Sequence, residues 1–168
     1  MESETDIEAK RTHCIRCGEC CLATGPSLQK ADLPLFYNHV IDGTHLYTIR
    51  KGELVRDNIH DELKLTDQEL LKFRDREEGK GCIFYDGNEK TCTIYGDRPS
   101  QCRAFGCWDD TEFEKVFSGP KARRKDIVKD SGLLRLIFAH ETKCNYETIS
   151  SHVEQIPDQG EKSVQEIL

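Results

Sequence analysis

The chain reads Cys14-Ile15-Arg16-Cys17-Gly18-Glu19-Cys20-Cys21 near its start, which places four cysteines within eight residues. Thiolates are the ligands that select zinc, copper(I) and iron–sulfur clusters, and two cysteines separated by two residues can bind one metal from a single turn. Gly18 lacks a Cβ, so the backbone there can adopt a positive φ and turn its N–H groups toward the sulfurs. We therefore predict a metal centre that begins in this stretch.

The spacing inside the stretch suggests which kind of centre it is. Cys14-x2-Cys17-x2-Cys20 has the spacing of three ligands in bacterial ferredoxins, although the x3-Cys-Pro that completes the ferredoxin motif is missing. Cys20 and Cys21 are neighbours, and adjacent Cα atoms lie about 3.8 Å apart, which is too close for an ordinary disulfide. In an extended backbone their side chains face opposite sides. We predict either a polynuclear cluster or two centres that share the stretch.

Five further cysteines follow, at positions 82, 92, 102, 107 and 144. Nine in 168 residues are too few for a disulfide-stapled miniprotein and more than an ordinary cytosolic enzyme carries. The first 12 residues are rich in Glu and Asp and lack the apolar segment of a signal peptide, and no apolar run reaches transmembrane length. We therefore expect a cytoplasmic protein without membrane association, whose cysteines bind metal rather than form disulfides.

The charge of the chain bears on its partners. A net charge of −7 argues against nucleic acid as the main partner. The one basic stretch, Lys121-Ala-Arg-Arg-Lys125, is interpreted as a solvated helix face, and the alternative is a binding patch for an acidic partner or nucleic acid. Catalytic signatures such as Gly-x-Ser-x-Gly or a phosphate-binding loop are missing. The acidic pairs Asp61-Glu62 and Asp109-Asp110 are interpreted as helix caps or solvated faces.

The length predicts one domain, which we place at residues 13–156, with a flexible charged arm at 1–12 and a polar, loose tail at 157–168. The apolar spacing predicts a helix within 28–40 and helices from Thr111 onward. A first hairpin is predicted for 46–49 and 54–55 around Lys51-Gly52, and a second for 82–85 and 92–95. Thr66-Asp-Gln-Glu69 predicts a capped helix through about Asp75, and a short helical turn follows Arg98-Pro99. The fold class is α+β: a small single domain with two short β-hairpins and several helices, organised around a cysteine-bound metal centre.

Three segments together resemble one known family. They are Cys14-x2-Cys17-Gly-x-Cys20-Cys21, then Cys82-Ile-Phe-Tyr85, then Cys92-Thr-Ile-Tyr95-x-x-Arg98-Pro99-x-x-Cys102-Arg103. In order, spacing and non-cysteine positions the chain resembles the CxxCxxCC cysteine-cluster family of zinc- or iron-chelating proteins, often called the YkgJ type, from about Cys14 to Cys107. The resemblance implies a metal centre built from Cys14, Cys17, Cys20, Cys21, Cys82, Cys92 and Cys102, with Cys107 as an eighth ligand.

The resemblance implies less about activity. Members are often named iron–sulfur oxidoreductases, and one branch resembles flagellin lysine N-methylases. We predict an iron–sulfur protein, with a 4Fe-4S cluster, that transfers electrons to a redox or protein partner or carries out a redox reaction. The alternative is a zinc protein whose metal is structural and whose helices form an interaction surface. A protein-modifying enzyme is the third hypothesis, and whether the chain is an enzyme at all stays open.

Several other side chains are candidates for supporting roles. We expect Tyr95 and Pro99 to pack around the centre and Arg98 and Arg103 to offset the thiolate charge. His13 adjoins Cys14. His140 lies four residues before Cys144, so on a helix the two share one face and could donate two metal ligands. The preferred interpretation is a surface histidine beside a small core cysteine.

Overall fold

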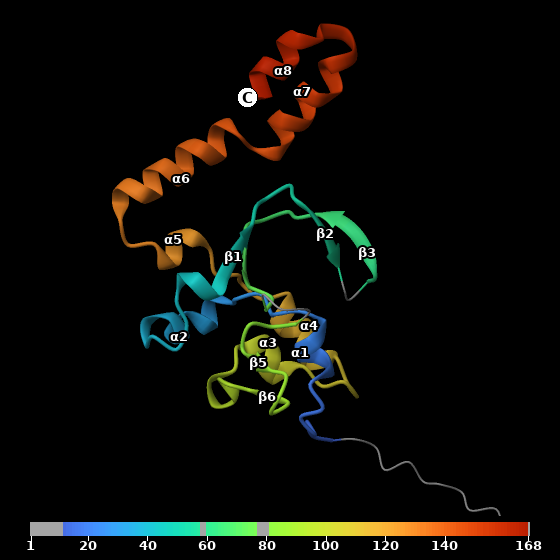
Figure 1. The fold of residues 1–168 in the computed structure, drawn as a ribbon, viewed down its shortest axis with the longest axis vertical. Helices are drawn as coiled ribbons and strands as arrows, with labels where there is room; N and C mark the ends of the chain where they lie inside the picture. Colours follow the sequence, from blue (N-terminus) through green and yellow to red (C-terminus); the bar gives the residue numbers. More distant parts are fainter. Residues whose placement is uncertain (1–11, 58–59, 77–80, 168) are drawn as a thin grey trace, which may run out of the picture.

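The computed structural model describes residues 12–57, 60–76 and 81–167, and it shows the predicted α+β class (Figure 1). The strands form short antiparallel pairs: β1 (Leu46–Ile49) with β4 (Leu70–Phe73), β2 (Leu54–Asp57) with β3 (Glu62–Leu65), and β5 (Tyr85–Asp86) with β6 (Thr91–Cys92). The α-helices are α1 (Glu19–Ala23), α2 (Leu33–Tyr37), α3 (Ser100–Ala104), α4 (Thr111–Phe117), α5 (Arg124–Ile127), α6 (Ser131–Lys143), α7 (Tyr146–Gln159) and α8 (Glu161–Ile167). Three 3-10 turns, η1 (Lys30–Asp32), η2 (Gly43–His45) and η3 (Tyr95–Asp97), complete the elements.

The first four strands form one long, bent hairpin. Leu46 pairs with Phe73 in β1–β4, and beyond an interruption the same register continues with Leu54 opposite Leu65 in β2–β3. Figure 1 shows the resulting curved ribbon. On the β1–β4 half, one face buries Leu46, Leu71 and Phe73 in the core. Alternation of buried and less buried side chains is what a half-buried strand pair requires.

The core of the protein lies around the β1–β4 pair. The rings of Phe73 and Phe84 meet edge to face with centroids 5.2 Å apart, and this arrangement joins the long hairpin to the segment that leads into β5. The other buried members of the cluster come from the segments before and after the strands: Leu28, Leu35, Ile41, Cys82 and Ala122. A single apolar cluster therefore connects the first half of the chain to the cysteine-bearing segments.

The prediction of a helix that begins at Thr66 is wrong, because residues 70–73 form strand β4. The Thr66 hydroxyl donates to the carbonyl of Arg50 instead of capping a helix, and Glu69 accepts hydrogen bonds from Arg124. The capping-box residues are present, but burial of Leu71 and Phe73 on one face favours the strand. Tertiary packing here overrides the local helix signal.

The first predicted hairpin is only half correct. A tight turn does form at Lys51-Gly52, with the Glu53 amide donating to the Arg50 carbonyl at 3.1 Å and Gly52 at φ +84°. The strands on either side do not pair with each other, however, because β1 pairs with β4 and β2 with β3. The turn is the bend of the long hairpin rather than its end.

Other local predictions hold with shorter bounds. The helix expected within 28–40 is divided between η1 and α2. The second hairpin forms at its predicted place, but only Tyr85 and Asp86 pair with Cys92 and Thr91, so Cys82 lies just before the strand. The turn after Arg98-Pro99 is α3, which carries Cys102 and Arg103. In the basic stretch, Lys121 is buried rather than solvated.

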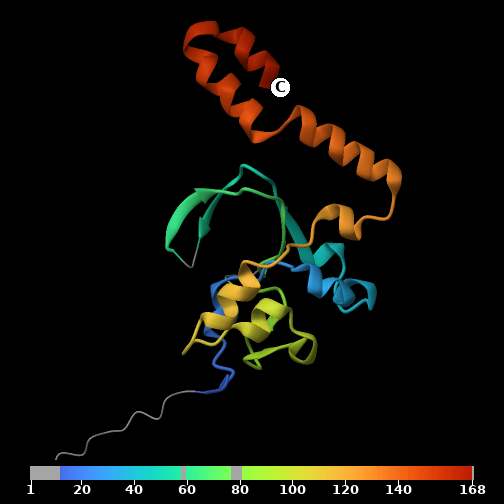
Figure 2. The same ribbon diagram turned by 180° about the vertical axis from the view of Figure 1, so that it is seen from behind.

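The C-terminal helices extend away from the rest of the molecule (Figures 1 and 2). Helix α7 continues through Pro157, and α8 follows it and packs against it, where the sequence predicted a loose polar tail. The flexible arm predicted for residues 1–12 lies almost entirely outside the described residues. The domain boundaries at 13 and 156 stay a prediction.

Asp32, which the sequence analysis missed, connects η1 to the cysteine-bearing helix α3. Its side chain is 1% exposed and accepts from the Gln29 amide at 2.9 Å, and from the amide and hydroxyl of Ser100 at 2.7 and 2.9 Å. These bonds attach the first turn of α3, two residues before Cys102, to the apolar core. A carboxylate with several donors is the most strongly held kind of buried polar group.

Replacing Asp32 with alanine is expected to lower the free energy of unfolding by about 3 kcal/mol, because buried donors lose an ionised acceptor. Urea titration followed by circular dichroism measures the change. Asp67→Ala is the control: this carboxylate is exposed between β3 and β4, and surface changes usually stay within about 0.5 kcal/mol. Equal midpoints for the two variants would contradict the role assigned to Asp32.

Candidate metal centre

Gly18 creates the bend that brings the N-terminal cysteines to the body of the protein. Its φ is +85°, and it directly precedes α1, which carries Cys20 and Cys21. A Cβ at this position would lie 2.2 Å from the hydroxyl of Tyr85, a buried side chain at the start of β5. Only glycine therefore allows both the left-handed backbone and this close approach, as the sequence suggested.

Cys21 and Cys82 are joined through the backbone. The Cys82 amide donates to the Cys21 carbonyl at 2.7 Å. Gly81, at φ +107°, allows the contact, since a Cβ there would lie 2.7 Å from the same carbonyl oxygen and 2.9 Å from the Leu22 Cα. The N-terminal stretch and the segment before β5, 61 positions apart in the chain, are thus held side by side.

Five cysteine thiols from four segments of the chain influence one another's pKa. The pKa of the Cys102 thiol is raised to about 12, first by burial and then by the thiolates of Cys82, Cys20 and Cys92. The pKa of Cys21 is raised first by its hydrogen bond to Cys20 and then by burial, with Cys102 and Cys92 adding to it. Mutual repulsion of this kind requires close approach. Together with the 4.0 Å between the Cys20 and Cys21 sulfurs and the hydrogen bond from the Cys82 amide, these interactions place five thiols in one region of the fold: Cys20, Cys21, Cys82, Cys92 and Cys102.

Cys20 is the thiol of this group that ionises most readily. Its sulfur lies 4.0 Å from that of Cys21, and this hydrogen bond lowers the pKa of Cys20 to about 6, against the opposing effect of burial. A thiol that is largely thiolate at neutral pH is ready to bind a metal ion.

Cys14, Cys17 and Cys107 are exposed, as is Cys20. The loop between Cys14 and Cys17 is held by Arg16, whose guanidinium carbon lies 4.1 Å from the centroid of the Tyr95 ring. Arg98 approaches the same ring at 3.8 Å, so two cations stack on one aromatic side chain. Tyr95 thus contacts the cysteine loop, which agrees with the packing role expected of it.

Cations accompany the thiols. Burial raises the pKa of Cys92 and Cys102, and the Arg98 guanidinium acts in the opposite direction on both thiols, as the sequence predicted for this arginine. Lys72 was not predicted: burial lowers its pKa, while Asp75 and the thiolates of Cys82 and Cys102 oppose the decrease. Arg103 is exposed instead, and the role expected for it stays a prediction.

The donor set fits a soft metal centre. Around a tetrahedral zinc ion with Zn–S bonds of about 2.3 Å, sulfurs lie about 3.8 Å apart, and Cys20 and Cys21 are close to that spacing. Within residues 12–57, 60–76 and 81–167, no three cysteine sulfurs lie within 4.8 Å of one another. In the same ranges, the buried side-chain amide nitrogen of Gln101, the residue before Cys102, has no hydrogen-bond partner.

The family model called CxxCxxCC, described as "Putative zinc- or iron-chelating domain", matches residues 13–118. The chain belongs to the CxxCxxCC family. The match includes all eight cysteines predicted as ligands and ends before Cys144, and α5 to α8 lie beyond it. No solved structure matches the chain. None of the described helices is long and apolar enough to cross a membrane.

Cys144, which lies outside the CxxCxxCC match, is at the junction of α6 and α7. Its amide donates to the His140 carbonyl at 2.7 Å, and its carbonyl accepts from Arg50 at 2.5 Å. Figure 1 places this junction far from α1 and α3. His140 and His13 are exposed. The structure therefore does not bring Cys144 or His140 to the five grouped thiols.

Two further features were not predicted from the sequence. Asp57, His60 and Glu62 hold their ligand atoms within 4.8 Å of one another at the end of the long hairpin. The Lys64 ammonium already pairs with the buried Asp57 carboxylate, so this group is a network of hydrogen bonds and ion pairs.

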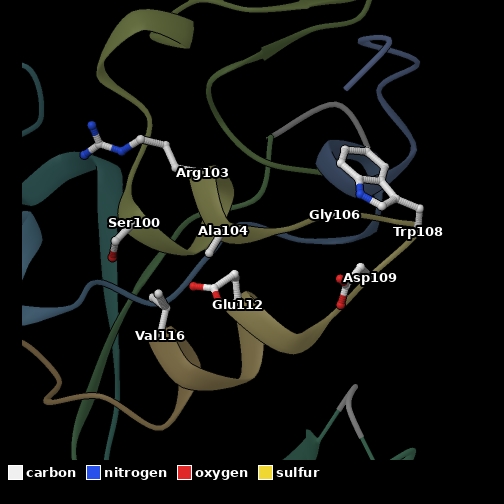
Figure 3. Close-up of a pocket in the computed structure, with 8 residues that line it drawn as sticks. All are labelled: Ser100, Arg103, Ala104, Gly106, Trp108, Asp109, Glu112 and Val116. Carbon is white, nitrogen blue, oxygen red and sulfur yellow. The ribbon is translucent and has the colours of Figure 1, made fainter. Parts of the chain in front are cut away.

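The second feature is an open groove of about 540 Å³ between α3 and α4, next to the cysteine-bearing segments. Arg103 and Trp108 stand at its two ends, with Glu112 between them (Figure 3). Its acidic groups have local partners. Asp109 accepts from the Thr111 amide at 3.0 Å, which agrees with its predicted role at a helix start, and Glu112 pairs with Lys115 at 2.6 Å.

Proposed function

We propose that this CxxCxxCC protein holds an iron–sulfur cluster and uses it for electron transfer or another redox reaction. The observation that carries the proposal is the convergence of five thiols from four segments, and the family match includes three more cysteines, Cys14, Cys17 and Cys107. That is more than the four ligands of a structural zinc ion. In the described residues no three of these sulfurs lie within 4.8 Å of one another, as three ligands of one zinc ion would, so a polynuclear centre fits the set better.

The roles of individual residues follow from the geometry. Cys20, Cys21, Cys82, Cys92 and Cys102 are proposed as ligands, and Cys14, Cys17 and Cys107 complete the set of eight. When bound, an iron–sulfur cluster accepts and donates single electrons. Arg98 and Lys72 place positive charge beside the thiols, which favours a net-negative centre, and burial, hydrogen bonds to sulfur and charge set its potential.

The cellular setting and partner are proposed on the same basis. Among the described residues no two cysteines form a disulfide, and nine cysteines without a disulfide are typical of a reducing compartment, so we propose the cytoplasm. A cluster that transfers electrons needs a redox partner protein, and we propose one that approaches the exposed Cys14 and Cys17.

Zinc with a structural role is the second candidate, because the Cys20–Cys21 sulfur spacing of 4.0 Å is close to that of two ligands on one zinc ion. The zinc hypothesis predicts a colourless protein, whose helices would then form the functional surface.

Protein purified without oxygen or added metal is expected to be brown, with broad absorbance near about 400 nm and equal amounts of iron and acid-labile sulfide. The measurement combines an absorption spectrum with iron, zinc and sulfide analysis. Stoichiometric zinc without sulfide would overturn the iron–sulfur proposal and establish the zinc alternative. Neither metal bound at all would overturn both.

A further inference from the structure

The loop between Cys14 and Cys17 carries two of the proposed ligands but is weakly attached through its backbone. Among the described residues, no hydrogen bond between main-chain groups joins residues 12–17 to another segment. Inside the loop, the Arg16 amide donates to the Cys14 sulfur at 3.4 Å. The loop ends at Gly18, which is buried. Gly18 therefore fixes one end of the loop, and side chains must hold the cysteines themselves.

The backbone of this loop has a conformation that most side chains disfavour. Arg16 has a φ of +58°, in the left-handed region that few residues other than glycine adopt. A residue keeps such a conformation only where its surroundings hold it there, and residues of this kind are concentrated at functional sites. A specific contact of the Arg16 side chain is therefore expected.

That contact is the ring of Tyr95. The Arg16 guanidinium carbon lies 4.1 Å from the ring centroid, and the Arg98 guanidinium carbon lies 3.8 Å from it. Arg98 is also fixed through its Nε, which donates to the Tyr95 carbonyl at 3.1 Å. A guanidinium within about 6 Å of an aromatic centroid is attracted by the ring. Arg16, Tyr95 and Arg98 together form the arginine–tyrosine stack.

The arginine–tyrosine stack lies beside two of the grouped thiols. Tyr95 begins η3, which connects Cys92 on β6 to α3, the helix that carries Cys102. Burial raises the pKa of Cys92 and Cys102, and the positive charge of Arg98 opposes the increase, so its guanidinium is within electrostatic reach of both thiols. Because Arg16 contacts the same ring as Arg98, the stack brings the loop to the grouped thiols.

We propose that the arginine–tyrosine stack positions Cys14 and Cys17 at the metal centre, with Tyr95 as the positioning residue, and that this loop opens when metal enters or leaves. The inference rests on the proposed function only in requiring a metal at the grouped thiols, whichever metal it is. Both cysteines are exposed. A segment that is held by surface side chains, without main-chain hydrogen bonds to its surroundings, is the kind that opens most readily.

Alkylation of the metal-loaded protein by iodoacetamide tests the proposal, with each cysteine peptide followed by mass spectrometry. In Tyr95→Leu, Cys14 and Cys17 are expected to react at least about threefold faster than in the wild type, because a cation–π contact at an exposed site changes an equilibrium by about that factor. Cys82 and Cys102 are expected to keep their wild-type rates. Faster reaction of all four cysteines would indicate a general loss of structure and would overturn the positioning role.

Two further tyrosine substitutions separate the effect of the aromatic ring from other effects. Tyr95→Phe keeps the aromatic face and is expected to retain the wild-type rates. Tyr146→Leu is the matched control: Tyr146 also carries a guanidinium, that of Arg50 at 5.1 Å, but it lies on α7, far from α1 and α3 (Figure 1). This change is expected to leave the loop cysteines unaffected. A Tyr95→Phe protein that behaves like Tyr95→Leu, or a Tyr146→Leu protein that does so, would overturn the proposal.

Arg16→Gln tests the contact between the loop and the ring, since glutamine keeps much of the side chain's length but carries no charge. This variant is expected to speed alkylation of the loop cysteines as much as Tyr95→Leu does. The two changes together are expected to have no more effect than either alone, because both remove the same contact. Effects that multiply would show that the two side chains act independently, and the proposal would then be wrong.

Loss of metal to excess EDTA distinguishes this inference from the proposed function. Tyr95→Leu is expected to lose its metal at least about threefold faster than the wild type, and Tyr95→Phe at the wild-type rate, for the same reason. Wild-type rates of alkylation and metal loss in Tyr95→Leu would overturn this inference and leave the iron–sulfur proposal standing. Zinc in place of iron and sulfide would overturn the iron–sulfur proposal alone, and a protein without metal would overturn both.

Discussion

Cys102→Ser is expected to remove the metal from the protein, whereas Cys144→Ser is expected to leave the metal content unchanged. Cys102 is carried by α3, and its thiol is close enough to Cys82, Cys20 and Cys92 for their charges to raise its pKa. Changes outside the ligand shell already cost 10–100-fold in metal affinity, so loss of a ligand is expected to cost more than about 100-fold. Cys144 lies at the end of α6 and is not among these thiols.

Metal per chain and the midpoint of thermal unfolding measure the effect. Because metal binding to a folded site adds directly to folding free energy, the Cys102→Ser protein is expected to unfold at a lower temperature as well. The Cys144→Ser control separates this effect from the general loss of a thiol. Wild-type metal content in Cys102→Ser, or lost metal in Cys144→Ser, would contradict the ligand assignment whichever metal is bound.

The parts of the structure that depend on short motifs could be predicted from the sequence. The glycine after Cys17, the hairpin around Asp86-Gly87 and the helical turn after Pro99 all form near their predicted places. In each, the conformation is decided by residues a few positions apart, through positive φ, a turn or a fixed proline φ.

The errors and omissions arise from contacts between distant segments. Thr66-Asp-Gln-Glu69 is an adequate helix start by itself, but Leu71 and Phe73 gain more by packing as a strand opposite β1. Asp32 finds its donor at Ser100, 68 positions away, and a single sequence gives no indication of that pairing. The position of Lys72 beside the thiols could not be predicted either, because it also depends on contacts between distant segments. Convergence of the cysteines was predictable in outline, because four thiolates in one short loop would strain around a single ion.

Gly81→Ala is expected to separate α1 from the segment before β5 and to destabilise the whole centre. Gly81 has φ +107°, a backbone conformation that costs other residues about 1–3 kcal/mol. The new Cβ would also lie 2.7 Å from the Cys21 carbonyl oxygen and 2.9 Å from the Leu22 Cα, and both are backbone atoms that cannot rotate away. The hydrogen bond from Cys82 to Cys21 would lengthen or break as α1 moves.

The expected loss in free energy of unfolding for Gly81→Ala is about 3 kcal/mol, from backbone strain and overpacking together, with weaker metal binding because Cys21 and Cys82 move apart. Gly96→Ala is the matched control, since a Cβ at Gly96 meets nothing within 4 Å among the described residues and φ there is not positive. Thermal unfolding and metal titration of both variants distinguish the two positions. If Gly81→Ala retains wild-type stability and metal affinity, the contact between Gly81 and the Cys21 carbonyl does not position the thiols. Equal losses in both variants would show that the effect is a general cost of replacing glycine.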